Sequence, residues 1–245
     1  MRFPVLIFDL DDTLIESFPE YVRLHQRIAA DLDWRIPSAR ELVHYGPTWP
    51  DTLARLWPDT SLDPFMARYQ ELADDHVYPS IPGVPAALEA LRSRGHSLWI
   101  VTKRSRTRLL QRMAQASLAP ELFAGIYAYE DQPVSKPDPR CFEPVWEALG
   151  GPAHERALYV GDREDDYLAA RAAGMRFVGV RTGPEHTAEH LAEHLDPAGA
   201  PENFGPPETP RVQPRASFLD ALPQADILDT AVDLHAWLQL QGPRA

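Results

Sequence analysis

The sequence predicts an α/β protein with a doubly wound, Rossmann-like parallel sheet as its core and a small α-helical domain. Short apolar segments alternate with segments of helical periodicity along most of the chain. The apolar segments are hydrophobic at nearly every position, which is typical of parallel strands that helices cover on both faces. A long stretch after the first of them carries only helical patterns, so we expect an inserted helical domain.

The expected strands are short and rich in β-branched and apolar residues. They lie at residues 4–9, 97–102, 125–130, 157–162, 177–181 and 225–229. Helical spacing that ends in glycine predicts helices at residues 84–95 and 165–174. This alternation of strands and helices indicates parallel strands joined by helical crossovers.

Two segments interrupt that alternation. Residues 17–79 are too long for a simple crossover and show helical patterns without a convincing strand. We therefore expect residues 1–16 and 80–245 to form the α/β core and residues 17–79 to form a helical cap domain. Residues 183–223 are rich in proline, and we expect them to form an irregular part of the core.

Composition narrows the classes of partner. The net charge of −12 repels phosphate backbones, so nucleic acid and anionic membrane surfaces are unsuitable partners. Cys141 is the single cysteine, which rules out an internal disulfide and is compatible with a reducing compartment. No targeting segment or membrane-spanning apolar stretch is evident, so we expect a cytoplasmic protein that acts on a small molecule.

Polar residues follow four of the expected strands, at the end where ligands bind in an open parallel sheet. These residues, in chain order, are Asp9, Asp11, Thr102, Lys103, Lys136, Asp162, Asp165 and Asp166. Because the carboxyl ends of parallel strands lie at one edge of the sheet, we expect these side chains to lie close together.

Carboxylates gathered at one edge repel one another unless they are protonated or bind a cation. Oxygen ligands select a hard ion, and Mg²⁺ suits a site that combines carboxylates with substrate phosphate. Lys136 offers a positive charge to a phosphate group and Thr102 offers a hydroxyl donor. Asp9 and Asp11 are two residues apart, so both can face the site while Leu10 points into the core. One carboxylate can then attack phosphorus while the other moves protons.

Four motifs together resemble the haloacid dehalogenase superfamily, and within it the phosphatases of the phosphoglycolate phosphatase type. They are FDLDDTL at residues 8–14, IVT ending at Thr102, SKPDP with Lys136, and VGDREDDYLAARAAGM at residues 160–175. Each motif alone is weak, but four in this order and separation form a specific pattern. The resemblance covers residues 3 to about 181 and resumes at ADILDTAVDLHAWL.

The resemblance implies a role for each matched residue. Asp9 would be the nucleophile that forms an aspartyl-phosphate, and Asp11 would protonate the leaving oxygen and then activate water. Mg²⁺ would be held by the carboxylates of Asp9 and Asp162 and by the main-chain carbonyl of Asp11. Asp166 would bind the ion directly or through water.

The resemblance also implies that Thr102 and Lys136 hold the phosphoryl oxygens of a phosphomonoester. The leading hypothesis is a Mg²⁺-dependent phosphatase, because dehalogenases lack the aspartate at position 11 and ion-pumping ATPases carry lysine between nucleophile and threonine. A phosphomutase acting on a sugar phosphate and a non-catalytic phosphate-binding protein are the alternatives. A receiver-type signalling domain also clusters acidic residues with Thr and Lys, but its order along the chain differs.

The helical insert resembles the small cap of this superfamily, in which the loop between two helices faces the phosphate. The segment HYGPTWP at residues 44–50 is the candidate loop, so we expect His44, Thr48 or Trp49 to reach the substrate. Lys103 could add positive charge near a more anionic substrate or be a solvated residue at the rim.

Further polar residues have ordinary structural explanations. Asp12 is expected to cap the turn after the first strand, and Asp165 to lie in the first turn of a helix. His186, His190 and His194 share one helical face and could chelate a metal, although an exposed polar helix is the simpler interpretation.

Overall fold

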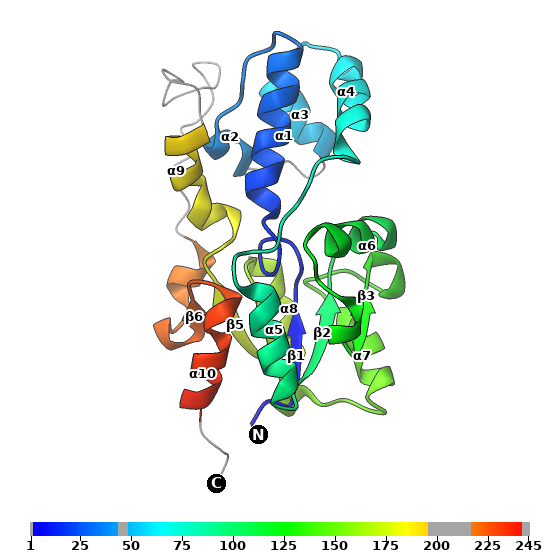
Figure 1. Cartoon of the computed structure of the whole chain (residues 1–245), viewed down its shortest axis with the longest axis vertical. Coiled ribbons are helices and arrows are strands. Elements are labelled where there is room, and N and C mark those ends of the chain that lie inside the picture. The colour runs from blue at the N-terminus through cyan, green and yellow to red at the C-terminus, as the bar shows by residue number, and fades with distance from the viewer. Residues whose placement is uncertain (1, 44–48, 196–216, 242–245) are drawn as a thin grey trace. The chain divides into compact units, whose positions relative to one another are not determined.

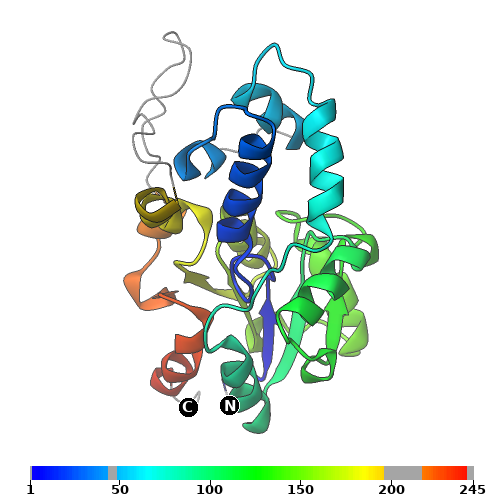
Figure 2. The same ribbon diagram turned by 45° about the horizontal axis from the view of Figure 1, so that its top comes forward.

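A computed structural model of the protein describes residues 2–43, 49–195 and 217–241 (Figures 1 and 2). The chain divides into two compact units. Unit 1 comprises Met1–Ser17, Val77–Gly183 and Phe218–Ala245, and unit 2 comprises Phe18–His76 and Pro184–Ser217. Among the described residues, no helix is long and apolar enough to cross a membrane.

Unit 1 contains the sheet that the sequence predicts. Within the described residues, six strands pair in the order β3-β2-β1-β4-β5-β6, and every neighbouring pair is parallel. The strands are β1 (Val5–Phe8), β2 (Ser97–Val101), β3 (Gly125–Tyr127), β4 (Ala157–Gly161), β5 (Arg176–Val180) and β6 (Ile227–Leu228). The predicted doubly wound α/β fold is confirmed.

The central strand β1 is apolar along its whole length because both of its faces are covered. Leu6 and Phe8 point into one apolar cluster, whereas Val5 and Ile7 point into the other, as the alternation of side chains along a strand requires. Helices α5 (Val84–Ser93), α6 (Arg106–Gln115) and α10 (Leu234–Leu240) contribute to the first cluster. Helices α7 (Glu143–Ala148) and α8 (Glu164–Ala172) contribute to the second.

The two helices predicted from terminal glycines end close to those glycines. Gly95 follows α5 with φ of 88° and Gly174 follows α8 with φ of 73°, a left-handed conformation that glycine adopts without strain. Short 3₁₀ segments complete the connections. They are Pro120–Leu122, Tyr129–Asp131, Pro139–Phe142, His154–Arg156, Phe218–Ala221, Gln224–Asp226 and Ala231–Asp233.

Unit 2 is helical within its described residues. Its helices are α1 (Ser17–Asp31), α2 (Ala39–Val43), α3 (Trp49–Leu56), α4 (Asp63–Ala73) and α9 (Pro184–Leu195), the first of which starts at the end of unit 1. Their buried residues form one apolar cluster.

Helix α9 forms within residues 183–223, which the sequence assigned to an irregular part of the α/β core but in which residues 186–194 showed helical spacing. It lies beside α2 (Figures 1 and 2). Ala188 and Leu191 are three residues apart and share a face, so both bury in the apolar cluster of unit 2. Arg40 of α2 also forms an ion pair with Glu189. This segment therefore groups with unit 2 because it begins with an amphipathic helix.

Candidate active site

The turn after β1 brings two carboxylates to the carboxyl end of the sheet. The main-chain N–H of Asp9 donates to the carbonyl of Val160, 2.9 Å away, which continues the pairing of β1 with β4. The chain then turns so tightly that the N–H groups of Leu14 and Ile15 both donate to the carbonyl of Leu10. Leu10 is fully buried in the core, which leaves its two aspartate neighbours for the site.

Asp12, the third carboxylate of this stretch, stabilises the turn. It adopts a left-handed conformation with φ of 54°, which aspartate tolerates better than most residues. Its Oδ1 accepts a hydrogen bond of 2.9 Å from the N–H of Ser17, and its carbonyl accepts one from the Thr182 hydroxyl. These contacts agree with the expected structural role of Asp12.

Lys136 is the buried cation at the centre of the site. Its Nζ donates to Asp9 Oδ1 at 2.7 Å, to Asp166 Oδ1 at 2.6 Å, to the Tyr159 hydroxyl at 2.8 Å and to the Val101 carbonyl at 3.3 Å. Burial opposes the charge of Lys136, but Asp166 and Asp9 outweigh that effect and raise its pKa above the ordinary value. The ammonium group therefore stays protonated and joins the ends of β1 and β2 and the middle of β4 to α8.

Asp9, Asp162 and Asp166 form a buried carboxylate cluster. One oxygen of each lies within 4.8 Å of the others, which is close enough to hold a metal ion. Burial raises the pKa of Asp9 to about 6, and Lys136 opposes that shift. Burial, with the charges of Asp12, Asp166 and Asp9, also raises the pKa of Asp162 well above its ordinary value. Both pKa shifts report the cost of burying carboxylates, increased by their neighbouring negative charges, and a cation would offset that cost.

Asp162 carries the clearest sign of a missing positive partner. Its Oδ1 accepts a hydrogen bond of 3.1 Å from the Thr13 hydroxyl, whereas its Oδ2 is buried without a hydrogen-bond partner among the described residues. A Cβ atom at Gly183 would come within 2.5 Å of that Oδ2, so only glycine leaves the space beside it. An unsatisfied carboxylate oxygen in an all-oxygen surrounding suits a hard cation such as Mg²⁺.

Asp166 differs from Asp162 because protein donors already engage both of its oxygens. Oδ1 accepts from Lys136 and from the Tyr159 hydroxyl at 3.1 Å, and Oδ2 accepts from the N–H of Arg163 at 3.1 Å. Oδ2 accepts one hydrogen bond and keeps a second lone pair, so Asp166 can contact a metal directly through Oδ2 or through water.

Arg104 holds the second carboxylate of the turn, Asp11. The guanidinium Nε lies 2.9 Å from Asp11 Oδ2 and Nη2 lies 2.7 Å from Oδ1, and the Ser17 hydroxyl also donates to Oδ1. Burial raises the pKa of Asp11, but the charge and hydrogen bonds of Arg104 and the Ser17 bond outweigh it, so the pKa is lowered. Thr102 ends β2 beside this pair, almost fully buried, and its Oγ1 accepts from the N–H of Arg104 at 3.2 Å.

The structure gathers most of the residues that the sequence placed at this edge. Lys103 is an exception, because it lies at the exposed rim and forms an ion pair with Asp165. His44 and Thr48 lie outside the described residues. Trp49 is the first residue of α3, and its side chain is not described.

Sequence reasoning did not single out Arg104, Ser17 or Tyr159. Arg104 follows Thr102 by two residues in a basic stretch, so its position just after a strand was the available signal. Tyr159 occupies an interior position of the buried β4 strand and is indistinguishable in sequence from a core aromatic residue. Only the packing shows that its hydroxyl reaches Lys136 and Asp166.

Known proteins share this arrangement of the chain. A family model described as haloacid dehalogenase-like hydrolase matches residues 6–180. The chain is 31% identical over 217 residues to a phosphoglycolate phosphatase of Mesorhizobium japonicum, covering 83% of this chain and 92% of that protein. It is 29% identical to phosphoglycolate phosphatase 1 of Pseudomonas aeruginosa, covering 76% of this chain and 72% of that protein.

Solved structures agree at the level of the fold. A crystal structure of a Haemophilus somnus protein superposes with a TM-score of 0.68 and 21% identity, covering 99% of both chains. A subfamily IA hydrolase of Geobacter sulfurreducens gives a TM-score of 0.61 at 25% identity, covering 74% of this chain and 88% of that one. The family match spans most of the chain and includes the whole carboxylate cluster and Lys136. The chain therefore belongs to the haloacid dehalogenase-like hydrolase family, as its motifs predicted.

Proposed function

We propose that this protein is a Mg²⁺-dependent phosphatase that hydrolyses a small phosphomonoester through an aspartyl-phosphate on Asp9. The observation that carries the proposal is the buried Lys136 bonded to Asp9, next to an Asp162 oxygen that has no hydrogen-bond partner among the described residues. Such a site combines a nucleophile, a fixed positive charge and a place for a hard cation. Phosphoryl transfer depends mainly on positioning and charge neutralisation, which these groups supply.

Asp9 acts as the nucleophile in this proposal. Lys136 fixes its Oδ1 at 2.7 Å, so we assign the attack on phosphorus to Oδ2. With a pKa of about 6 the carboxyl is mostly ionised at neutral pH, and the lysine charge favours that form. Attack forms the Asp9–phosphorus bond while the bond from phosphorus to the alcohol oxygen breaks, and Thr102 and Lys136 hold the phosphoryl oxygens.

Asp11 transfers a proton in the step that forms the aspartyl-phosphate and again in the step that hydrolyses it. Asp11 is ionised in the ligand-free site, so in this proposal it first takes up the proton that a monoanionic phosphomonoester brings. It then donates that proton to the departing alcohol oxygen and becomes a carboxylate again. It then takes a proton from the water that attacks phosphorus, which releases inorganic phosphate and restores Asp9. Arg104 lies against both Asp11 oxygens and stabilises the carboxylate form, which is the form that activates water.

The residues that would hold Mg²⁺ are the Asp9 and Asp162 carboxylates and the main-chain carbonyl of Asp11. Asp166 would contact it directly through Oδ2, which accepts only one hydrogen bond from the described residues, or through water. When bound, the ion supplies positive charge that offsets the carboxylate cluster and the phosphate group.

The position of Arg104 favours substrates that carry a negative charge on the alcohol part of the phosphomonoester. If Asp11 lies next to the bridging oxygen, the guanidinium beside it stands near the substituent of the alcohol. A negative charge there would be favoured, because a guanidinium binds carboxylates through paired hydrogen bonds. Phosphoglycolate, the substrate in the names of the relatives from Mesorhizobium japonicum and Pseudomonas aeruginosa, carries such a carboxylate. It is therefore the first substrate to test.

Two further parts of the proposal concern the protein as a whole. We propose that the helical unit 2, including α9, is the cap that sets substrate specificity, and that the α/β unit carries the chemistry. We also propose that the protein acts in the cytoplasm on a small soluble phosphomonoester and not on nucleic acid or membranes, in keeping with its net charge of −12.

The test is phosphate release from a panel of phosphoglycolate, sugar phosphates and nucleoside monophosphates, with Mg²⁺ and with a chelator. We expect turnover that requires Mg²⁺, and acid-quenched protein that carries one phosphoryl group on the peptide containing Asp9. Conversion of a sugar phosphate into its isomer would instead identify a phosphomutase. Folded protein that releases no phosphate from any substrate with Mg²⁺ present would overturn the proposal in favour of a binding protein.

A further inference from the structure

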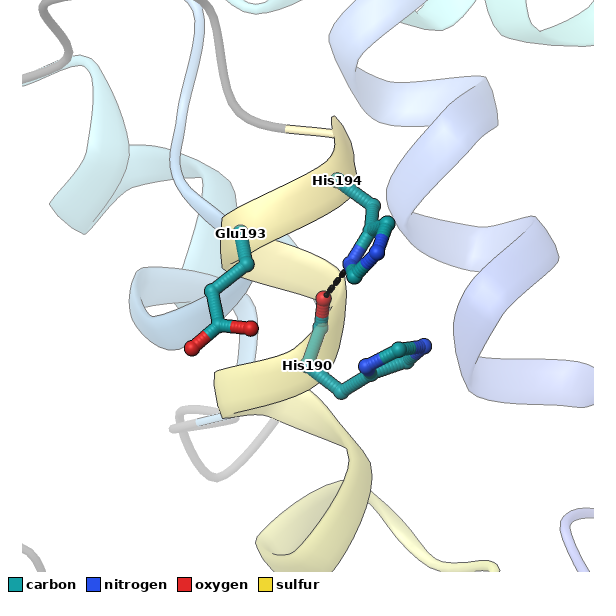
Figure 3. A group of neighbouring side chains, drawn as sticks. All are labelled: His190, Glu193 and His194. Carbon is teal, nitrogen blue, oxygen red and sulfur yellow. Dashed lines mark hydrogen bonds between the residues drawn. The ribbon is translucent and has the colours of Figure 1, made fainter.

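Helix α9 of unit 2 carries a second group of side chains that can bind a metal, independent of the carboxylate cluster. His190, Glu193 and His194 each offer one ligand atom, and these atoms lie within 4.8 Å of one another (Figure 3). All three residues are exposed. We call them the α9 cluster. His186, the third histidine of the predicted face, lies one turn earlier and is only partly exposed.

The spacing of the α9 cluster is suited to chelation. Residues three and four apart lie on one side of an α-helix, so their side chains can meet above a single turn. Two histidines at i and i+4 provide two of the zinc ligands in H-E-x-x-H helices. Here the two imidazole rings have centroids 4.1 Å apart, and Figure 3 shows both on the same side of the helix.

A hydrogen bond prepares His194 to act as a ligand. Its Nδ1 lies 2.7 Å from the main-chain carbonyl of His190. A carbonyl oxygen can only accept, so Nδ1 carries the hydrogen and the neutral ring keeps its lone pair on Nε2. Metal-binding histidines are commonly oriented in this way, with one ring nitrogen donating to a carbonyl and the other binding the ion.

The charges around the α9 cluster favour a cation. Glu193 forms no ion pair with any residue of the described part of the chain, whereas Glu189, one turn earlier, is paired with Arg40. The donor set of two imidazole nitrogens and one carboxylate suits borderline ions such as Zn²⁺. Mg²⁺ prefers oxygen ligands throughout.

We propose that His190, Glu193 and His194 form a binding site for a divalent late transition metal ion, with Zn²⁺ as its first candidate. Water would complete the coordination, because the site is open to solvent. The ion would join successive turns of α9, a helix of 12 residues that would be marginal without its packing. Because the folded helix presents all three ligands together, Zn²⁺ would stabilise the folded protein in proportion to occupancy.

The test is a calorimetric titration of the full chain with ZnCl₂ in millimolar Mg²⁺, after prior removal of transition metals. Wild type should bind one Zn²⁺ with micromolar affinity. His190→Gln and His194→Gln should each weaken binding by at least the roughly 10- to 100-fold that loss of an outer partner costs a metal site. Glu193→Gln should weaken it less.

Matched controls separate the α9 cluster from charge effects and from the active site. Glu185→Gln makes the same charge change in the first turn of α9, and His235→Gln removes a histidine from α10, so both should leave Zn²⁺ affinity unchanged. Asp162→Asn should also bind Zn²⁺ normally, whatever its activity. X-ray absorption of the Zn²⁺ complex should show two imidazole ligands.

The four substitutions on α9 change exposed side chains, and the fold of every variant is checked by circular dichroism without metal. Wild-type protein that takes up no Zn²⁺ at millimolar concentration would overturn the proposal. Zn²⁺ binding as tight in both histidine variants as in wild type would do the same, because the ion would then lie elsewhere.

Discussion

The carboxylate cluster of unit 1 and the α9 cluster of unit 2 differ first in burial. The carboxylates are buried with Lys136, whose side chain is 2% exposed, whereas the α9 cluster is open to solvent. Buried negative charges are costly without a partner, so the fold supplies Lys136 and leaves a place for a cation. Exposed ligands carry no such penalty. Occupancy of the α9 cluster should therefore depend on metal concentration, whereas the carboxylate cluster needs positive charge at all times.

The largest expected effect of any substitution concerns Asp9. Asp9→Asn removes the nucleophile but keeps the shape of the side chain, so turnover should fall by about 10⁴-fold or more. Circular dichroism should show an unchanged fold. Asp165→Asn, at the exposed rim, is the control and should retain most activity. Comparable turnover in Asp9→Asn and wild type would exclude the proposed mechanism.

Asp162→Asn tests whether the carboxylate cluster needs a cation, because it should impair activity but stabilise the protein without Mg²⁺. It should raise the Mg²⁺ concentration for half-maximal activity by roughly 10- to 100-fold, since a candidate ligand is lost. Without Mg²⁺ the variant should be more stable than wild type at pH 7, because a buried charge is gone. Activity titrated with Mg²⁺ measures the first effect, and thermal unfolding without Mg²⁺ measures the second.

The sign of the pH dependence follows from the raised pKa of Asp162. The metal-free folded protein binds this proton more tightly than the unfolded chain does. The stability of the wild type should therefore fall as pH rises above about 4, the ordinary pKa of aspartate, and Asp162→Asn should flatten this decline. A wild type that gains stability over the same range, with the variant unchanged, would contradict the assigned shift.

Arg104→Gln should have an intermediate effect that depends on the charge of the substrate. A hydrogen bond to a charged group contributes about 1.5–3 kcal/mol, which corresponds to roughly 10- to 100-fold in kcat/KM. We expect that loss of kcat/KM for phosphoglycolate relative to 2-hydroxyethyl phosphate, in which an uncharged hydroxymethyl group replaces the carboxylate. Lys103→Gln, at the exposed rim, should change kcat/KM for both substrates by the same factor. An equal loss for both substrates in Arg104→Gln would show that Arg104 acts only through Asp11.

The smallest effect is expected for the ion pair between Arg40 and Glu189. Both side chains are about half exposed, at 46% and 62%, so Arg40→Ala should lower the free energy of unfolding by no more than about 1 kcal/mol. Leu191→Ala, which empties a buried position of the same helix, should cost about 2–5 kcal/mol. Denaturant titrations compare the two. A larger effect at Arg40 would mean that charge, and not apolar packing, holds α9.

The strands and the edge where polar residues gather could be predicted because parallel topology decides both. Apolar runs such as Val5–Phe8 that alternate with helical segments are typical of strands covered on two faces, and the residues after them meet at one edge. Asp9, Lys136 and Asp166 were placed there by position in the chain alone. That they lie near one another follows from the parallel topology, whereas their individual contacts do not.

Only the tertiary structure shows which side chains those residues contact and in which unit α9 packs. The contact of Arg104 with Asp11 joins residues 93 apart in the chain, and the contact of Tyr159 with Lys136 turns an apparent core aromatic into a hydrogen-bond acceptor. Residues 183–223 showed helical spacing only around their histidines, and packing alone shows that Ala188 and Leu191 of this helix bury in unit 2. The physical reason is that local periodicity determines which way a side chain faces. The residues that it contacts come from segments distant in the sequence, and only packing brings those segments together.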